Sequence, residues 1–141
     1  PKRLHLHRYL PKTMKRIVVG SNGLDMTDIL KPEHIASRIT FVKKPIALNI
    51  IEHGQEAIKK LIDKAEQLVG KQQEELVIES IEHMQEQESA SLERLIALAK
   101  VNPSIRDSEL SQQKAKIKDL RTYIKRASFK LDAIRVILVT D

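Results

Sequence analysis

A long stretch without proline constrains this chain more than any other feature of its sequence. Between Pro45 and Pro103 there is no proline, and Ile, Leu, Ala, Glu, Gln and Lys dominate. Apolar residues recur there at steps of three, four and seven, which is the seam of a long amphipathic helix. A helix is therefore predicted over residues 49–100. Its seam consists of Ile51, Ile58, Ile62, Ala65, Val69 and Leu76, followed by Val77, Ile81, Met84, Leu95 and Leu98.

A second helix is predicted after a short connector. Asn102 and Pro103 are expected to end the first helix, and Asp107 is placed to cap the next one. Because so short a connector forces neighbouring helices to run antiparallel, residues 49–130 are predicted to form a coiled-coil hairpin. The second seam comprises Leu110, Ile117, Leu120, Ile124, Ala127, Leu131 and Ile134.

The two ends of the chain are rich in residues that favour strands. Strands are expected around Leu4 to Leu6, at 14–19, at 39–42 and at 134–139, with a tight turn at Asn22-Gly23. Pro32 is expected to open a single helical turn that extends through Ala36.

These patterns together predict an α+β fold. In this fold a small, mainly antiparallel sheet is attached to the long antiparallel helical hairpin. Residues 1–48 and 131–141 would supply the sheet part, and residues 1–141 would form a single domain.

Composition excludes several classes of function. Aromatic residues make up only 3% of the chain, too few for the stacking platforms of single-strand binding modules. Cysteine is absent, so disulfide frameworks and thiol catalysis are excluded. No apolar run approaches the roughly 20 residues of a membrane span, and a cytoplasmic location is expected.

The chain begins Pro-Lys-Arg without Met, and a fragment of a larger protein is the simplest explanation.

The net charge of +6 comes partly from four cations on the second helix. Lys114, Lys118, Arg121 and Lys125 are spaced by four, three and four residues, so they share one stripe of the helix. The stripe is open to two interpretations: it tracks the phosphates of DNA or RNA, or it pairs with acidic residues of the first helix. The second interpretation is favoured, because antiparallel coiled coils commonly flank their seams with opposite charges. Binding of DNA or RNA would then be weak. The acidic residues concerned are Glu74, Glu75, Glu79, Glu82, Glu86 and Glu88.

Other candidate sites are weaker. Ile105 and Arg106 lie at the tip of the hairpin, where a loop on a projecting element is well placed to contact a partner. His5 and His7 alternate on one expected strand without a carboxylate or thiol partner, so no metal site is expected from them. Catalytic, cofactor-binding and metal-binding residues are therefore not assigned in this chain.

The chain resembles the C-terminal region of the bacterial RNA polymerase-associated RapA family. Residues 101–110 at the hairpin tip and residues 131–140 near the end carry the most specific resemblance. Residues 8–11, residues 17–19 and the Asn22-Gly23 turn are similar to the segment that precedes the family's long helices.

This resemblance implies a parent protein of the SWI/SNF type, an ATPase that binds RNA polymerase and promotes its recycling during transcription. ATP and magnesium would be needed by the parent, whose nucleotide motifs lie in other domains. No G-x-x-x-x-G-K-[ST] motif occurs here, so this chain is expected to be a non-catalytic accessory domain. Its implied partners are RNA polymerase, through the parent, and the parent's other domains. The alternative is a free-standing coiled-coil module that binds nucleic acid electrostatically.

Overall fold

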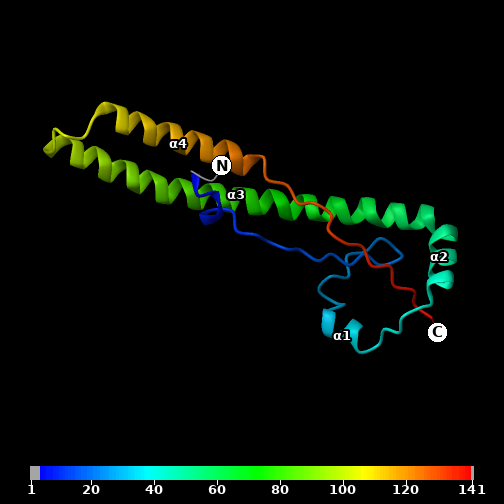
Figure 1. Cartoon of the computed structure of the whole chain (residues 1–141). Coiled ribbons are helices and arrows are strands. Elements are labelled where there is room, and N and C mark those ends of the chain that lie inside the picture. Colours follow the sequence, from blue (N-terminus) through cyan, green and yellow to red (C-terminus); the bar gives the residue numbers. More distant parts are fainter. Residues whose placement is uncertain (1–3, 141) are drawn as a thin grey trace. The chain divides into compact units, whose positions relative to one another are not determined.

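A computed structural model describes residues 4–140, and every regular element in that range is helical. In chain order these are the 3-10 helix η2 (Leu6–Arg8), α1 (Pro32–Ala36), α2 (Lys44–His53), α3 (Gln55–Val101) and α4 (Asp107–Lys125) (Figure 1). The α+β prediction is therefore wrong, since no strand or sheet forms between residues 4 and 140. None of the helices in this range is long and apolar enough to cross a membrane.

The segments predicted as strands lack the partners that a strand needs. β-Branched residues favour strands only where a neighbouring strand completes the hydrogen bonds and packs on the side chains. Only one isolated antiparallel bridge forms in the described range, between Val19 and Asp25 across the Asn-Gly turn. In that turn Gly23 has a φ of 77°, a left-handed conformation that glycine adopts without strain. Residues 134–139 stay exposed; Val139, for example, is 88% exposed.

The first predicted strand is instead a turn that buries apolar side chains. His5 adopts a left-handed conformation with a φ of 48°, and the 3-10 helix η2 follows directly. Leu4 and Leu6 both pack against the core, so their alternation with histidine reflects a tight turn rather than a strand.

The chain divides into two compact units, which are described separately. One unit contains residues 13–74, with the Asn-Gly turn, α1, α2 and the first part of α3. Pro32 occupies the first turn of α1, as predicted, and Pro45 occupies the first turn of α2. The predicted long helix is interrupted at Gly54, which lies between α2 and α3. Gly70 lies inside α3 without interrupting it.

The other unit contains residues 4–12 and 75–140, and its centre is an antiparallel hairpin of α3 and α4 (Figure 1). The prediction that Asn102 and Pro103 follow the end of the first helix is confirmed, because α3 ends at Val101. Helix α4 begins at Asp107 and ends at Lys125 rather than near residue 130, so Leu131 and Ile134 fall outside the seam and are exposed.

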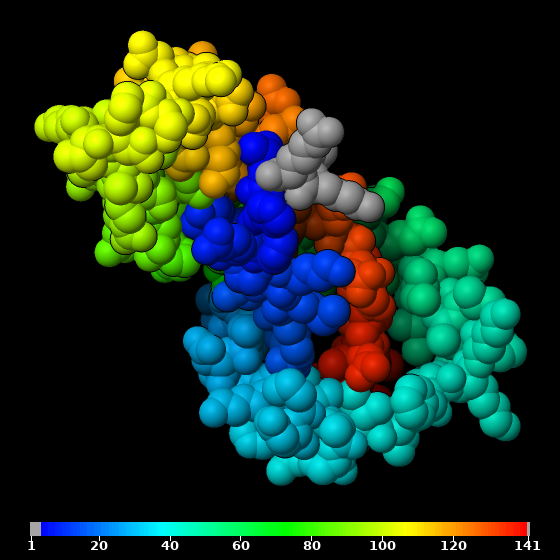
Figure 2. Space-filling model, turned by 60° about the vertical axis from the view of Figure 1, so that its left-hand side comes forward, coloured from blue at the N-terminus to red at the C-terminus, as the bar shows by residue number. Residues whose placement is uncertain are grey.

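The core of this second unit lies between the two helices and the N-terminal segment. Met84 on α3 and Leu120 and Ile124 on α4 are completely buried, and Tyr9 is 5% exposed. Half-buried apolar residues surround them: Leu4, Leu6, Val77, Ile81 and Ile117. The segment containing η2, dark blue in Figure 2, lies over the hairpin helices, and η2 contacts α4. The predicted seams therefore form the core here, although Leu98 is 48% exposed.

Candidate functional site

A buried carboxylate lies in the middle of the apolar seam. Glu88 on α3 is only 3% exposed, four residues after the buried Met84 and seven before the half-buried Leu95. A charge at such a position is costly unless hydrogen bonds replace the water that it loses.

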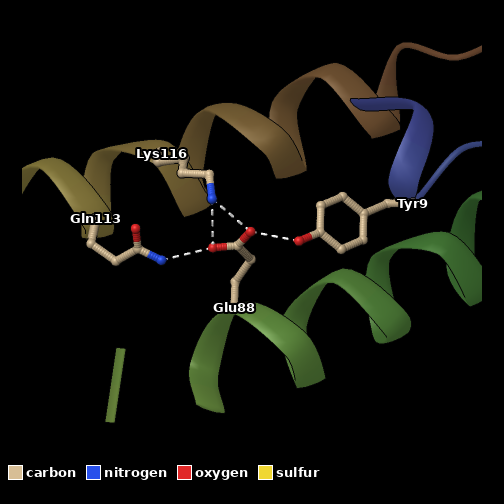
Figure 3. A network of polar contacts seen from close by, with 4 residues as sticks. All are labelled: Tyr9, Glu88, Gln113 and Lys116. Carbon is tan, nitrogen blue, oxygen red and sulfur yellow. Dashed lines mark hydrogen bonds and ion pairs between the residues drawn. The ribbon is translucent and has the colours of Figure 1, made fainter. Parts of the chain in front are cut away.

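Three side chains surround this carboxylate and supply four hydrogen bonds (Figure 3). The Tyr9 hydroxyl donates to Oε1 at 2.5 Å, and the Gln113 amide donates to Oε2 at 2.7 Å. Lys116 Nζ contacts both oxygens, at 2.8 and 3.0 Å. The acceptor positions of the carboxylate are thus filled, and no buried side-chain polar atom within residues 4–140 lacks a partner.

The protonation states follow from this environment. Burial acts to raise the pKa of Glu88, but the hydrogen bonds from Lys116, Tyr9 and Gln113 outweigh burial and hold this pKa below its ordinary value. Burial, together with the hydrogen bond to the Glu88 carboxylate, raises the pKa of Tyr9 to about 12. At neutral pH Glu88 is therefore a carboxylate and Tyr9 a neutral phenol.

The 3-10 helix η2 positions Tyr9 for this contact. The Tyr9 amide donates to the carbonyl of Leu6 at 3.1 Å, which closes the turn and directs the ring into the hairpin. The ring of His83 meets the Tyr9 ring edge-on, with centroids 5.8 Å apart. The phenol is thus fixed from both the N-terminal segment and α3.

An open cavity of about 290 Å³ adjoins the network. It is lined by Arg8, Tyr9, Gln87, Glu88, Ser91, Leu95, Gln113 and Lys116. Because Glu88 already accepts four hydrogen bonds, it is not poised to take a proton from a substrate. The network joins three segments of the chain, namely the N-terminal segment, α3 and α4.

The cationic stripe lies on a different face of α4 from Lys116. Lys114, Lys118, Arg121 and Lys125 are all exposed. The favoured interpretation paired them with the acidic residues of the first helix, yet the ion pair between Lys116 and Glu88 is the only one between residues 4 and 140. The four stripe cations thus have no carboxylate partner in that range.

Local hydrogen bonds stabilise the conformation of the hairpin tip. Asn102 Oδ1 accepts hydrogen bonds from the amide and the hydroxyl of Ser104, at 3.0 and 2.5 Å. The N-cap residue of α4 is Arg106 rather than the predicted Asp107, and the Arg106 backbone amide donates to the Glu109 carboxylate at 3.3 Å. The Arg106 side chain is exposed, whereas Ile105 is half-buried. The structure does not bring these two residues together with the cavity.

Sequence reasoning missed the roles of Tyr9, Gln113 and Lys116. One signal was available, since Glu88 occupies a seam position between Met84 and Leu95, where an apolar residue is expected. A charged residue at a seam position predicts a buried counter-charge. The sequence did not indicate that Tyr9 would be a partner, because the segment around Leu4 to Leu6 was expected to form a strand rather than the turn that positions Tyr9. No group of three or more His, Asp or Glu side chains that could hold a metal ion occurs in the described part of the chain.

Sequence comparison with known proteins places this chain in a family. The profile described as "RNA polymerase recycling family C-terminal" matches residues 1–139. The chain is 35% identical to the RNA polymerase-associated protein RapA of Vibrio vulnificus strain CMCP6, over 99% of this chain and 14% of the relative. It is 34% identical to the proteins of the same name from Vibrio campbellii and Vibrio parahaemolyticus, with the same coverage. It thus spans about a seventh of the length of these relatives. The chain belongs to the RNA polymerase recycling family and corresponds to the family's C-terminal region.

Proposed function

We propose that this chain acts as a non-catalytic C-terminal domain of an RNA polymerase-associated ATPase of the SWI/SNF type. In this proposal the parent protein binds RNA polymerase in the cytoplasm, uses ATP and magnesium, and promotes recycling of the polymerase. The family match over residues 1–139 carries the proposal, together with relatives that are about seven times longer than this chain.

The polar chemistry of the hairpin supports a role in contact rather than catalysis. Its one buried carboxylate is engaged by three side chains from two other segments, so this group stabilises the hairpin. The exposed surface of the hairpin lies on regular helix, a suitable support for a recognition surface. The domain would therefore contribute a contact surface for the polymerase or for the other domains of the parent.

The experiment compares the full-length parent with a parent that lacks the region equivalent to residues 1–141. RNA polymerase binding, ATP hydrolysis and the yield of multi-round transcription are measured separately. We expect polymerase binding to weaken by at least about tenfold, a loss of about 1.4 kcal/mol, while ATP hydrolysis persists. Adding the 141-residue chain in trans controls for misfolding of the shortened parent. Unchanged polymerase binding and unchanged transcription yield would overturn the proposal.

A further inference from the structure

The cationic stripe of α4 is the strongest charged feature outside the Glu88 network. The stripe consists of Lys114, Lys118, Arg121 and Lys125 and extends over about 16 Å of helix, at 1.5 Å per residue. From residue 114 to residue 126 the chain carries six cations and only one anion, Asp119. Of the six, Lys116 alone has a carboxylate partner within the described residues, namely Glu88.

Packing against the core does not account for the position of the four stripe cations. The seam of α4 consists of residues such as Leu120 and Ile124, which are completely buried, whereas every stripe residue is exposed. A packing role would place the stems of these side chains against apolar neighbours and reduce their exposure. Four exposed like charges within one helix face also repel one another, at a small cost in helix stability. A bound anion would remove this repulsion.

The surroundings of the stripe favour a phosphate backbone over a protein surface. The centre of a protein–protein interface is depleted in charge and enriched in aromatic and apolar residues. The exposed residues beside the stripe are small or polar instead: Ser111, Ala115 and Thr122. Three of the four cations are lysines, which act as flexible point charges rather than as planar forks for base edges.

We propose that the stripe of Lys114, Lys118, Arg121 and Lys125 on α4 binds the phosphate backbone of a nucleic acid without reading its sequence. This inference goes beyond the proposed function, which requires no nucleic-acid contact from this region. Each cation that meets a phosphate releases a condensed counterion, so affinity falls steeply with salt. The four contacts give weak binding, with a Kd of about 10⁻⁴ to 10⁻⁶ M at physiological salt.

The test measures fluorescence anisotropy of a labelled oligothymidylate and a labelled short duplex with the 141-residue chain, at salt concentrations from about 50 to 200 mM. The variant K114Q/K118Q/R121Q/K125Q removes the stripe and keeps good helix formers at exposed positions. Its matched control is K59Q/K60Q/K64Q/K71Q, which removes four exposed lysines of α3 and lowers the net charge equally. A third variant, K114R/K118R/K125R, keeps the charge of the stripe. Circular dichroism confirms that each variant retains its helices.

We expect the stripe variant to lose most of its affinity and to reduce the salt slope by about three to four on duplex. The α3 control and the arginine variant should keep the slope of the original chain. An equal loss in the stripe variant and the α3 control would show that only net charge matters, and would overturn the proposal. Tighter binding to an acidic peptide of equal charge than to the oligonucleotides would also overturn it, in favour of an acidic protein partner.

Discussion

Glu88 shows how one residue can decide the stability of the hairpin. Its carboxylate accepts hydrogen bonds from Tyr9 in the N-terminal segment and from Gln113 and Lys116 on α4. Glu88→Gln keeps the size of the side chain but removes the charge and leaves the Lys116 ammonium group without a counter-ion. We expect the free energy of unfolding to fall by about 1–3 kcal/mol, measured by urea denaturation.

The control for this change is Glu86→Gln on the same helix. Glu86 is exposed, so its replacement should alter stability by no more than about 0.5 kcal/mol. Equal stability of the two variants would show that the buried network contributes nothing net.

The same carboxylate makes stability depend on acid pH. Because the pKa of Glu88 is lowered in the folded chain, its contribution to stability is present above the ordinary glutamate value of 4.5 and is lost as pH falls through the folded value. The difference in unfolding free energy between the original chain and Glu88→Gln should therefore shrink below about pH 4.5.

Comparing the original chain with the Glu88→Gln variant separates the effect of Glu88 from that of other acid-sensitive groups. The pKa of Asp25 is also lowered, through hydrogen bonds from Thr27, but Asp25 is unchanged in both proteins. Urea denaturation at several pH values from about 6 to 3 makes the measurement. A difference that stays constant over this range would contradict the lowered pKa of Glu88.

At the scale of elements, α4 is held to α3 by a few completely buried side chains. Leu120 has no exposed surface, so Leu120→Ala should leave a cavity and lower the unfolding free energy by about 2–5 kcal/mol. Leu98→Ala makes the same chemical change on α3 at a side chain that is 48% exposed, and should cost clearly less. Thermal or urea denaturation of both variants provides the measurement, and similar losses would argue against the core described here.

The helices were largely predictable from the sequence, whereas the segments outside them were not. Periodicity identified α3 and α4, and Pro32 and Pro103 marked the start of α1 and the end of α3, because helix signals lie within a few neighbouring residues. A strand depends instead on a partner elsewhere in the chain, and residues 134–139 find none within residues 4–140. The four-residue network was missed for a similar reason, since Tyr9 and Glu88 are 79 positions apart.

At the scale of the whole molecule, the central expectation is that the hairpin closes within a single chain. The connector between α3 and α4 contains only residues 102–106, so the two seams meet without the loss of translational entropy that a dimer would require. We expect the helical signal in circular dichroism to be independent of protein concentration over at least about a hundredfold range. Helicity that rises with concentration would indicate an intermolecular coiled coil instead.

The Glu88 network has a final consequence, which concerns the alignment of the two helices. Apolar seam residues resemble one another, so helices with seven-residue repeats can slide by one repeat and still bury Ile and Leu. Such a slide would carry Gln113 and Lys116 about 10 Å along the helix axis, at 1.5 Å per residue. The Glu88 carboxylate would then lose these two hydrogen-bond partners and stay buried beside apolar side chains. A buried charge without its partner lowers the stability of the fold by several kcal/mol. The network therefore stabilises one register of α4 against α3 over the alternatives.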